Sequence, residues 1–195
     1  MMATEVGHSL SSPLDLRKTA MWAFLASEFM FFGAFIATFL LYRGKLNGGP
    51  GPEELFDVPF TSVSSFVLLS SSLTMVLAHH AWEQNDQRQL RIWLAATALL
   101  GMTFLGGQVF EFTTFVDEGL SLSTSPFGSS FFILTGFHGA HVAVGVLMLV
   151  SMVIISSRVG LEKSRGMNVE LVGLYWHFVD IVWIVIFTVV YLVQV

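Results

Sequence analysis

The chain ends in an apolar stretch, residues 171–193, which limits its possible folds more than any other feature. A helix of roughly 20 apolar residues crosses the hydrocarbon core of a bilayer. His177 and Asp180 lie inside this stretch, three residues apart and therefore on one face of a helix. An Asp near the membrane centre costs about 2.5–3.5 kcal/mol on insertion scales, so this face should contact protein or water. Two roles fit the pair: a structural lock between helices, or proton handling.

The composition extends this interpretation to the whole chain. Of 195 residues, 54% are hydrophobic and 12% charged, which leaves too little polar surface for a soluble domain of this size. We expect an all-α, polytopic membrane bundle of about five transmembrane helices, preceded by a polar tail at residues 1–18, with residues 19–195 as one membrane domain. The expected spans are residues 19–42, 60–82, 90–115, 126–156 and 171–193.

Two further observations concern the possible binding chemistry of the chain and its orientation in the membrane. Cysteine is absent, which excludes disulfides and thiolate metal sites in this chain, and no basic stripe suggests nucleic acid binding. Lys and Arg concentrate in the tail and in alternate loops, at Arg17, Lys18, Arg88, Arg91, Arg158, Lys163 and Arg165. Because such loops stay on the cytoplasmic side, we expect the N-terminus inside and the C-terminus outside.

Small residues recur four positions apart, a spacing that lets membrane helices approach closely. The predicted packing pairs are Ala23/Ser27, Gly33/Ala37, Gly136/Ala140 and Gly139/Ala143.

Glu28 lies roughly 14 Å along its expected helix from the inner end, close to the bilayer centre. Its sequence neighbours are apolar or aromatic, so burial disfavours the charged carboxylate. This favours a proton-exchanging role over a purely structural one. Glu111 is a second intramembrane carboxyl, expected nearer the outer surface.

His138 and His141 are one helical turn apart, and ligation of a haem or metal is the alternative to interhelical hydrogen bonding. A transmembrane haem needs a His on each of two helices at matching depth. His177 is expected about 7 Å deeper toward the inner side than His141, so the match is poor. No Gly-x-Ser-x-Gly context for a nucleophilic enzyme is present.

Two segments together carry a family resemblance. Phe131-Phe-Ile-Leu-Thr-Gly-Phe-His-Gly-Ala-His-Val-Ala-Val-Gly145 and Tyr175-Trp-His-Phe-Val-Asp-Ile-Val-Trp183 closely resemble the paired signature of subunit III of haem–copper terminal oxidases. Ala26-Ser-Glu-Phe-Met-Phe-Phe32, Ala78-His-His80 and Gln108-Val-Phe-Glu111 resemble further signature positions in the same order. The resemblance runs from Thr19 to the C-terminus and matches the short, five-helix bacterial form.

This resemblance implies a non-catalytic subunit of a proton-pumping cytochrome c oxidase in the aerobic respiratory chain, in the bacterial plasma membrane. Such a subunit carries no haem or copper itself; these belong to partner subunits. It packs on subunit I, accompanies subunit II, binds phospholipid, supports proton uptake and can join a respiratory supercomplex. Glu28 matches the family's carbodiimide-reactive carboxylate.

The remaining candidates receive roles from their expected positions in the bundle. His79 and His80 are expected at the inner surface, where they could collect protons or be ordinary surface histidines. His138, His141, His177 and Asp180 are expected to form a network that holds the last two helices together, with lipid or proton roles secondary. The rival functions are a quinol oxidase subunit III, an accessory subunit of a nitric oxide reductase, a proton-coupled transporter and a b-type cytochrome.

Overall fold

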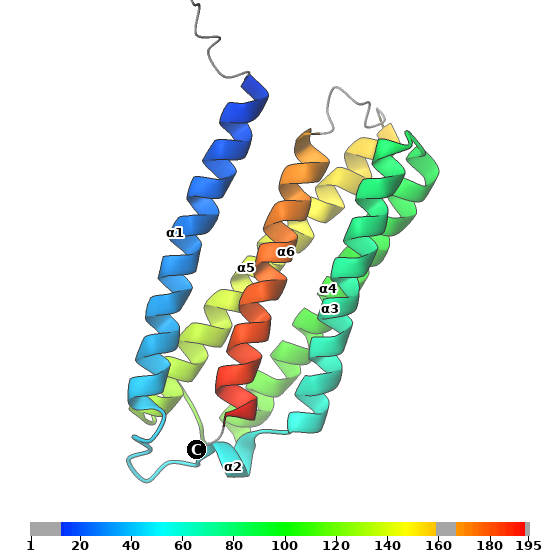
Figure 1. Ribbon diagram of the computed structural model, residues 1–195. Helices are drawn as coiled ribbons and strands as arrows, with labels where there is room; N and C mark the ends of the chain where they lie inside the picture. The colour runs from blue at the N-terminus through cyan, green and yellow to red at the C-terminus, as the bar shows by residue number, and fades with distance from the viewer. Residues whose placement is uncertain (1–12, 159–166, 194–195) are drawn as a thin grey trace, which may run out of the picture.

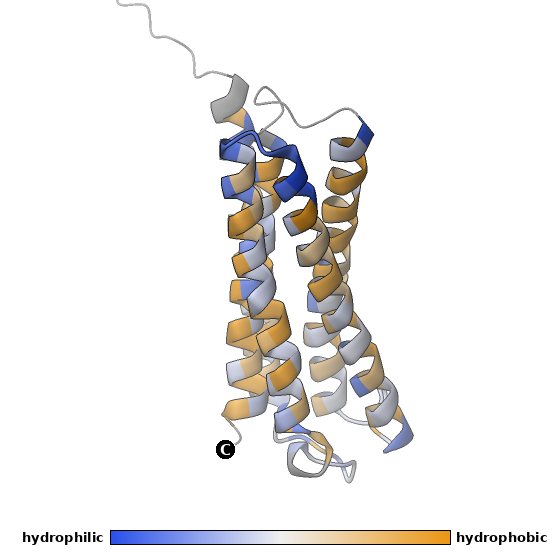
Figure 2. Cartoon of the chain, turned by 90° about the vertical axis from the view of Figure 1, so that its right-hand side faces the viewer, coloured by the Kyte–Doolittle hydropathy of each residue, from blue (hydrophilic) through white to orange (hydrophobic). Residues whose placement is uncertain are grey.

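The computed structural model describes residues 13–158 and 167–193. Over these residues it confirms an all-helical membrane protein, with five helices long and apolar enough to cross a bilayer. These five are α1 (Pro13–Tyr42), α3 (Val58–Glu83), α4 (Gln87–Asp117), α5 (Pro126–Arg158) and α6 (Met167–Phe187). They run side by side as one bundle (Figure 1), with the most hydrophilic residues at the helix ends (Figure 2).

The connections follow from local capping chemistry. The side chain of Asp57 accepts a hydrogen bond from the Phe60 amide, and Asp86 accepts from the two amides that open α4. These carboxylates satisfy amide groups that have no partner within the helix. Asn85 adopts a φ of 61°, a left-handed conformation that Asn tolerates, and this permits the short turn between α3 and α4.

Three details differ from the expectations. The first helix begins at Pro13 instead of Thr19, so part of the expected tail is helical. The loop before α3 contains a single helical turn, α2 (Pro52–Leu55). The last helix ends in a π-helical turn, η2 (Thr188–Leu192), which buries Tyr191. Lys163 and Arg165, used for the orientation, lie outside the described residues.

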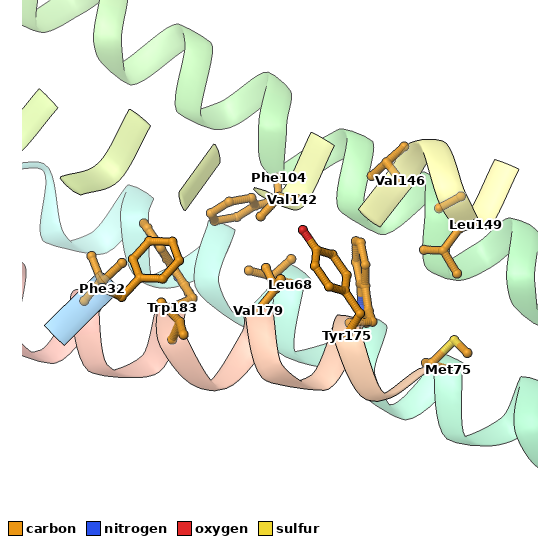
Figure 3. Close-up of a cluster of buried hydrophobic side chains, with 14 of the residues drawn as sticks. Phe32, Leu68, Met75, Phe104, Val142, Val146, Leu149, Tyr175, Val179 and Trp183 are labelled. Carbon is orange, nitrogen blue, oxygen red and sulfur yellow. The ribbon is translucent and has the colours of Figure 1, made fainter. Parts of the chain in front are cut away.

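α6 is the central helix and α1 the peripheral one. In the most apolar stretch of α6, 44% of the residues are buried, whereas in the corresponding stretch of α1 only 17% are buried. Tyr175, Val179 and Trp183 extend from α6 into the interior, where they meet side chains from the other helices (Figure 3). Much of α1 is therefore left to contact lipid or another protein.

Candidate functional site

The first cluster of polar groups joins α1, α5 and α6. Nε2 of His141 lies 3.1 Å from Oε2 of Glu28, and both side chains are 18% exposed. The Tyr175 hydroxyl donates to the backbone carbonyl of His141 over 3.0 Å. The Glu28 carboxyl, expected among apolar neighbours, therefore has a polar partner 113 residues away in the sequence.

The hydrogen bonds of His141 determine what this pair can hold. Its Nδ1 lies 2.7 Å from the carbonyl oxygen of Phe137, and because a carbonyl only accepts, Nδ1 must carry a hydrogen. In a neutral imidazole Nε2 is then an acceptor, and Glu28 must supply the proton between them. The alternative is an imidazolium beside a carboxylate. In both forms a hydrogen bond between the two side chains requires one proton, carried by one partner or the other.

A second cluster joins α6 to α3. Nδ1 of His177 lies 3.0 Å from the Ser72 hydroxyl, and that hydroxyl donates to Oδ2 of Asp180. Asp180 is 2% exposed, and its other oxygen, Oδ1, has no hydrogen-bond partner among the described residues. His177 and Asp180 therefore share a face, as their spacing predicted, but this face points to α3 and not to α5.

Serines of α3 bind the two buried tryptophans of α6. The indole nitrogen of Trp176 donates to Ser71 Oγ, and that of Trp183 donates to Ser65 Oγ, each over 2.9 Å. A buried indole N–H that lacks an acceptor is costly, so these serines fix the register between the helices. These contacts explain two of the hydroxyl side chains of α3, Ser65 and Ser71.

His138 is held by aromatic contacts. It is fully buried, its ring is stacked on Trp183 at 4.8 Å, and Phe104 and Phe32 contact it at 6.0 and 6.4 Å (Figure 3 shows Trp183, Phe104 and Phe32). Neither ring nitrogen has a hydrogen-bond partner in the described part of the chain. Three aromatic rings therefore surround the imidazole of His138, whereas both ring nitrogens of His141 have hydrogen-bond partners.

The expected network between the last two helices is thus replaced by separate links. α5 and α6 are joined by the His138–Trp183 stack and by the Tyr175 hydroxyl. His141 instead connects α5 to α1. Within residues 13–158 and 167–193, no three His, Asp or Glu side chains could hold a metal ion together.

Glu111 belongs to a third cluster, near the other end of the bundle. Thr61 of α3 donates to its Oε1 over 2.7 Å, and the Tyr191 side chain also forms a hydrogen bond with it. Nearby on α4, the Gln108 amide donates to the backbone carbonyl of Thr135 over 2.7 Å. The resemblance placed Gln108 and Glu111 in one motif, and the structure shows that both join helices.

The two histidines at the end of α3 have local partners. Nδ1 of His79 lies 3.8 Å from Glu83, and Nε2 of His80 lies 2.9 Å from the Gln84 amide. His79 also lines a pocket of about 330 Å³ between α1, α3 and α6, together with His177, Lys18 and Glu170. His80 does not line that pocket, so the structure separates the two histidines.

Helices also approach closely at two glycines that the four-residue spacing of small residues did not select. A Cβ added at Gly101 would lie 2.6 Å from the Trp176 ring, and one at Gly145 would lie 2.8 Å from it. Of the predicted packing glycines, Gly139 faces Gln108 at close range, whereas a Cβ added at Gly33 would meet no atom of the described residues within 4 Å. The Trp176 indole therefore occupies a slot between α4 and α5 that only glycine leaves open.

Comparison with known protein families shows to which family this chain belongs. The family described as "Cytochrome c oxidase subunit III" matches residues 4–195. The chain belongs to the cytochrome c oxidase subunit III family. It is 42% identical over 171 residues to "Cytochrome c oxidase subunit 3" of Bacillus sp. (strain PS3), covering 88% of this chain and 83% of the relative.

Relatives within the subunit III family also include quinol oxidases. The "Probable quinol oxidase subunit 3" of Staphylococcus saprophyticus is 41% identical over 180 residues, covering 92% of this chain and 90% of the relative. The same-named protein of Staphylococcus aureus (strain USA300) is 38% identical with the same coverage. Membership makes the chain a multi-pass subunit of an oxidoreductase complex that associates with other oxidase subunits.

Proposed function

We propose that this chain is the non-catalytic subunit III of a proton-pumping haem–copper oxidase that takes electrons from cytochrome c. The family match over residues 4–195 carries the proposal. We place haem and copper in partner subunits, because His138, His141 and His177 are engaged in aromatic stacks and hydrogen bonds. The peripheral helix α1, with its large exposed apolar surface, is suited to pack on the catalytic subunit I, beside subunit II, in a bacterial plasma membrane.

Lipid binding is the second part of the proposal. A pocket of about 330 Å³ between α1 and α6 is lined almost wholly by apolar side chains, among them Trp22, Phe29, Phe178 and Ile181. It adjoins the pocket near Lys18, and Trp22, Leu174 and His177 line both. An acyl chain matches the apolar part of this groove, and a phospholipid headgroup matches the end where Lys18 and Glu170 form an ion pair.

Support of proton uptake is the third part. The Glu28–His141 hydrogen bond requires one proton, and the pair is partly exposed at 18%, so water or a partner subunit can reach it. Nothing in the pair requires a redox centre within this chain. Glu28 therefore acts as the proton-exchanging carboxyl, with His141 as its partner.

The electron donor decides between two forms of the complex. Quinol is the second candidate, because the quinol oxidase relative is 41% identical and the cytochrome c oxidase relative 42%. The test is to purify the complex through a tag on this chain and to supply reduced cytochrome c or a quinol. Oxidation of cytochrome c with oxygen uptake supports the proposal, and oxidation of quinol alone replaces it with the second candidate.

A further inference from the structure

Two groups of polar side chains, which share one pocket, lie between one surface of the bundle and Asp180. At the surface, Glu83 lies 3.8 Å from His79, and His79 lines the pocket near Lys18 and Glu170, between α1, α3 and α6. His177 lines the same pocket from α6. Behind His177, the Ser72 hydroxyl contacts both the imidazole and the Asp180 carboxyl.

Among these polar groups, Asp180 is a buried carboxyl with an incomplete set of hydrogen-bond partners. It is 2% exposed, and Oδ1 lacks a hydrogen-bond partner among the described residues. No ion pair with a basic side chain compensates it within residues 13–158 and 167–193. A buried, uncompensated carboxylate is costly, and binding a proton removes that cost.

We propose that Asp180 is a proton-binding site, loaded from the pocket through His177 and Ser72. The pocket can hold several water molecules, each of which takes about 30 Å³ in the liquid.

The proton passes from His177 through Ser72 to Asp180 in two steps. A hydronium ion that reaches the pocket from bulk solvent gives its proton to Nε2 of His177 and becomes water. That Nε2 makes no hydrogen bond to a described residue, while Nδ1–H faces Ser72 Oγ. The Nδ1 proton then moves to Ser72 Oγ as the Ser72 hydroxyl proton moves to Oδ2 of Asp180. The products are neutral His177 protonated on Nε2, an intact Ser72 hydroxyl and a protonated Asp180. Reversal of these steps releases the proton.

Other charged groups around the pocket modulate this loading. Lys18 of α1 and Glu170 of α6 form an ion pair of 2.5 Å, so they largely neutralise each other. His79 is the titratable group that faces the pocket from α3. Glu28 belongs to a different cluster, with His141, so the two carboxyls can be tested independently.

The experiment is infrared spectroscopy of the purified oxidase complex during exchange from H₂O to D₂O. We expect a protonated carboxyl band that shifts in D₂O and is lost in Asp180→Asn but kept in Glu28→Gln. Ser72→Ala should keep the band but slow its shift by about a hundredfold, a typical effect of losing a positioned proton-transfer group. Ser72→Thr, which keeps the hydroxyl, should restore the rate.

Ser70→Ala is the matched control, because Ser70 lies on the same helix and donates only to the Phe66 carbonyl. Its exchange should equal that of the unmodified complex. An unchanged spectrum in Asp180→Asn would overturn the proposal, as would equal exchange rates in Ser72→Ala and Ser70→Ala. Either result would leave the oxidase assignment intact, because that assignment is tested by the haem spectrum and by donor oxidation.

Discussion

Glu28 and His141 lie 113 residues apart in the sequence and 3.1 Å apart in the structure. The contact joins the peripheral helix α1 to α5, in a bundle where α1 has the least buried apolar stretch. Because Nδ1 of His141 donates to a carbonyl, a hydrogen bond between its Nε2 and Glu28 requires a proton carried by one of the two. The pair therefore links α1 to α5, and it is also the group that we expect to exchange protons.

Replacing Glu28 with Gln should leave assembly intact, since an amide can still donate to Nε2, but it removes the carboxyl that we expect to exchange protons. We expect slower proton uptake or a shorter turnover lifetime in the purified complex. Glu118→Gln is the control, because Glu118 is exposed at the end of α4. If proton uptake and lifetime both match the control, Glu28 has only a structural role.

Gly101→Ala should destabilise the complex by about 1–3 kcal/mol, the usual cost of overpacking a well-packed interior. The added methyl would meet the Trp176 ring at 2.6 Å and Val146 at 2.9 Å. Gly106→Ala on the same helix has open space around it and should be neutral or slightly stabilising. Thermal denaturation of the two variant complexes measures the difference, and equal midpoints would show that α4 moves freely to accommodate the methyl.

His138→Phe should retain stability to within about 1.5 kcal/mol, because the ring stacks on Trp183 and neither nitrogen has a partner in the described structure. His138→Ala removes the stacked ring and should cost about 3 kcal/mol. Denaturation midpoints of both complexes provide the test. A large loss in His138→Phe would instead indicate a buried polar partner of the imidazole, such as a water molecule.

The inside location of the N-terminus is tested with single cysteines, which the cysteine-free chain makes unambiguous. Gln84→Cys lies in the turn after α3, and Ser123→Cys lies in the loop before α5. A membrane-impermeant maleimide should label Ser123→Cys in intact cells but label Gln84→Cys only after permeabilisation. The reverse pattern would invert the orientation.

The helices were predictable from the sequence because lipid sets both their length and their composition. The partners of the polar residues were less predictable. The spacing of His177 and Asp180 indicated a shared face but not that it turns to Ser72 of α3, because periodicity within one helix does not define its rotation against neighbours. Likewise, the four-residue spacing selected Gly33, where an added Cβ would meet no described atom within 4 Å, and missed Gly101 and Gly145. Those glycines matter because the large Trp176 ring lies between them, a relationship between three helices.

The most direct test of the oxidase subunit assignment is purification of the tagged chain from its own membranes in a gentle detergent, with a visible absorption spectrum and identification of the co-purifying proteins. We expect a haem-bearing polytopic partner to accompany the chain, and the chain separated from it to be colourless. Recovery of the chain alone, or haem bound to the isolated chain, would contradict the account.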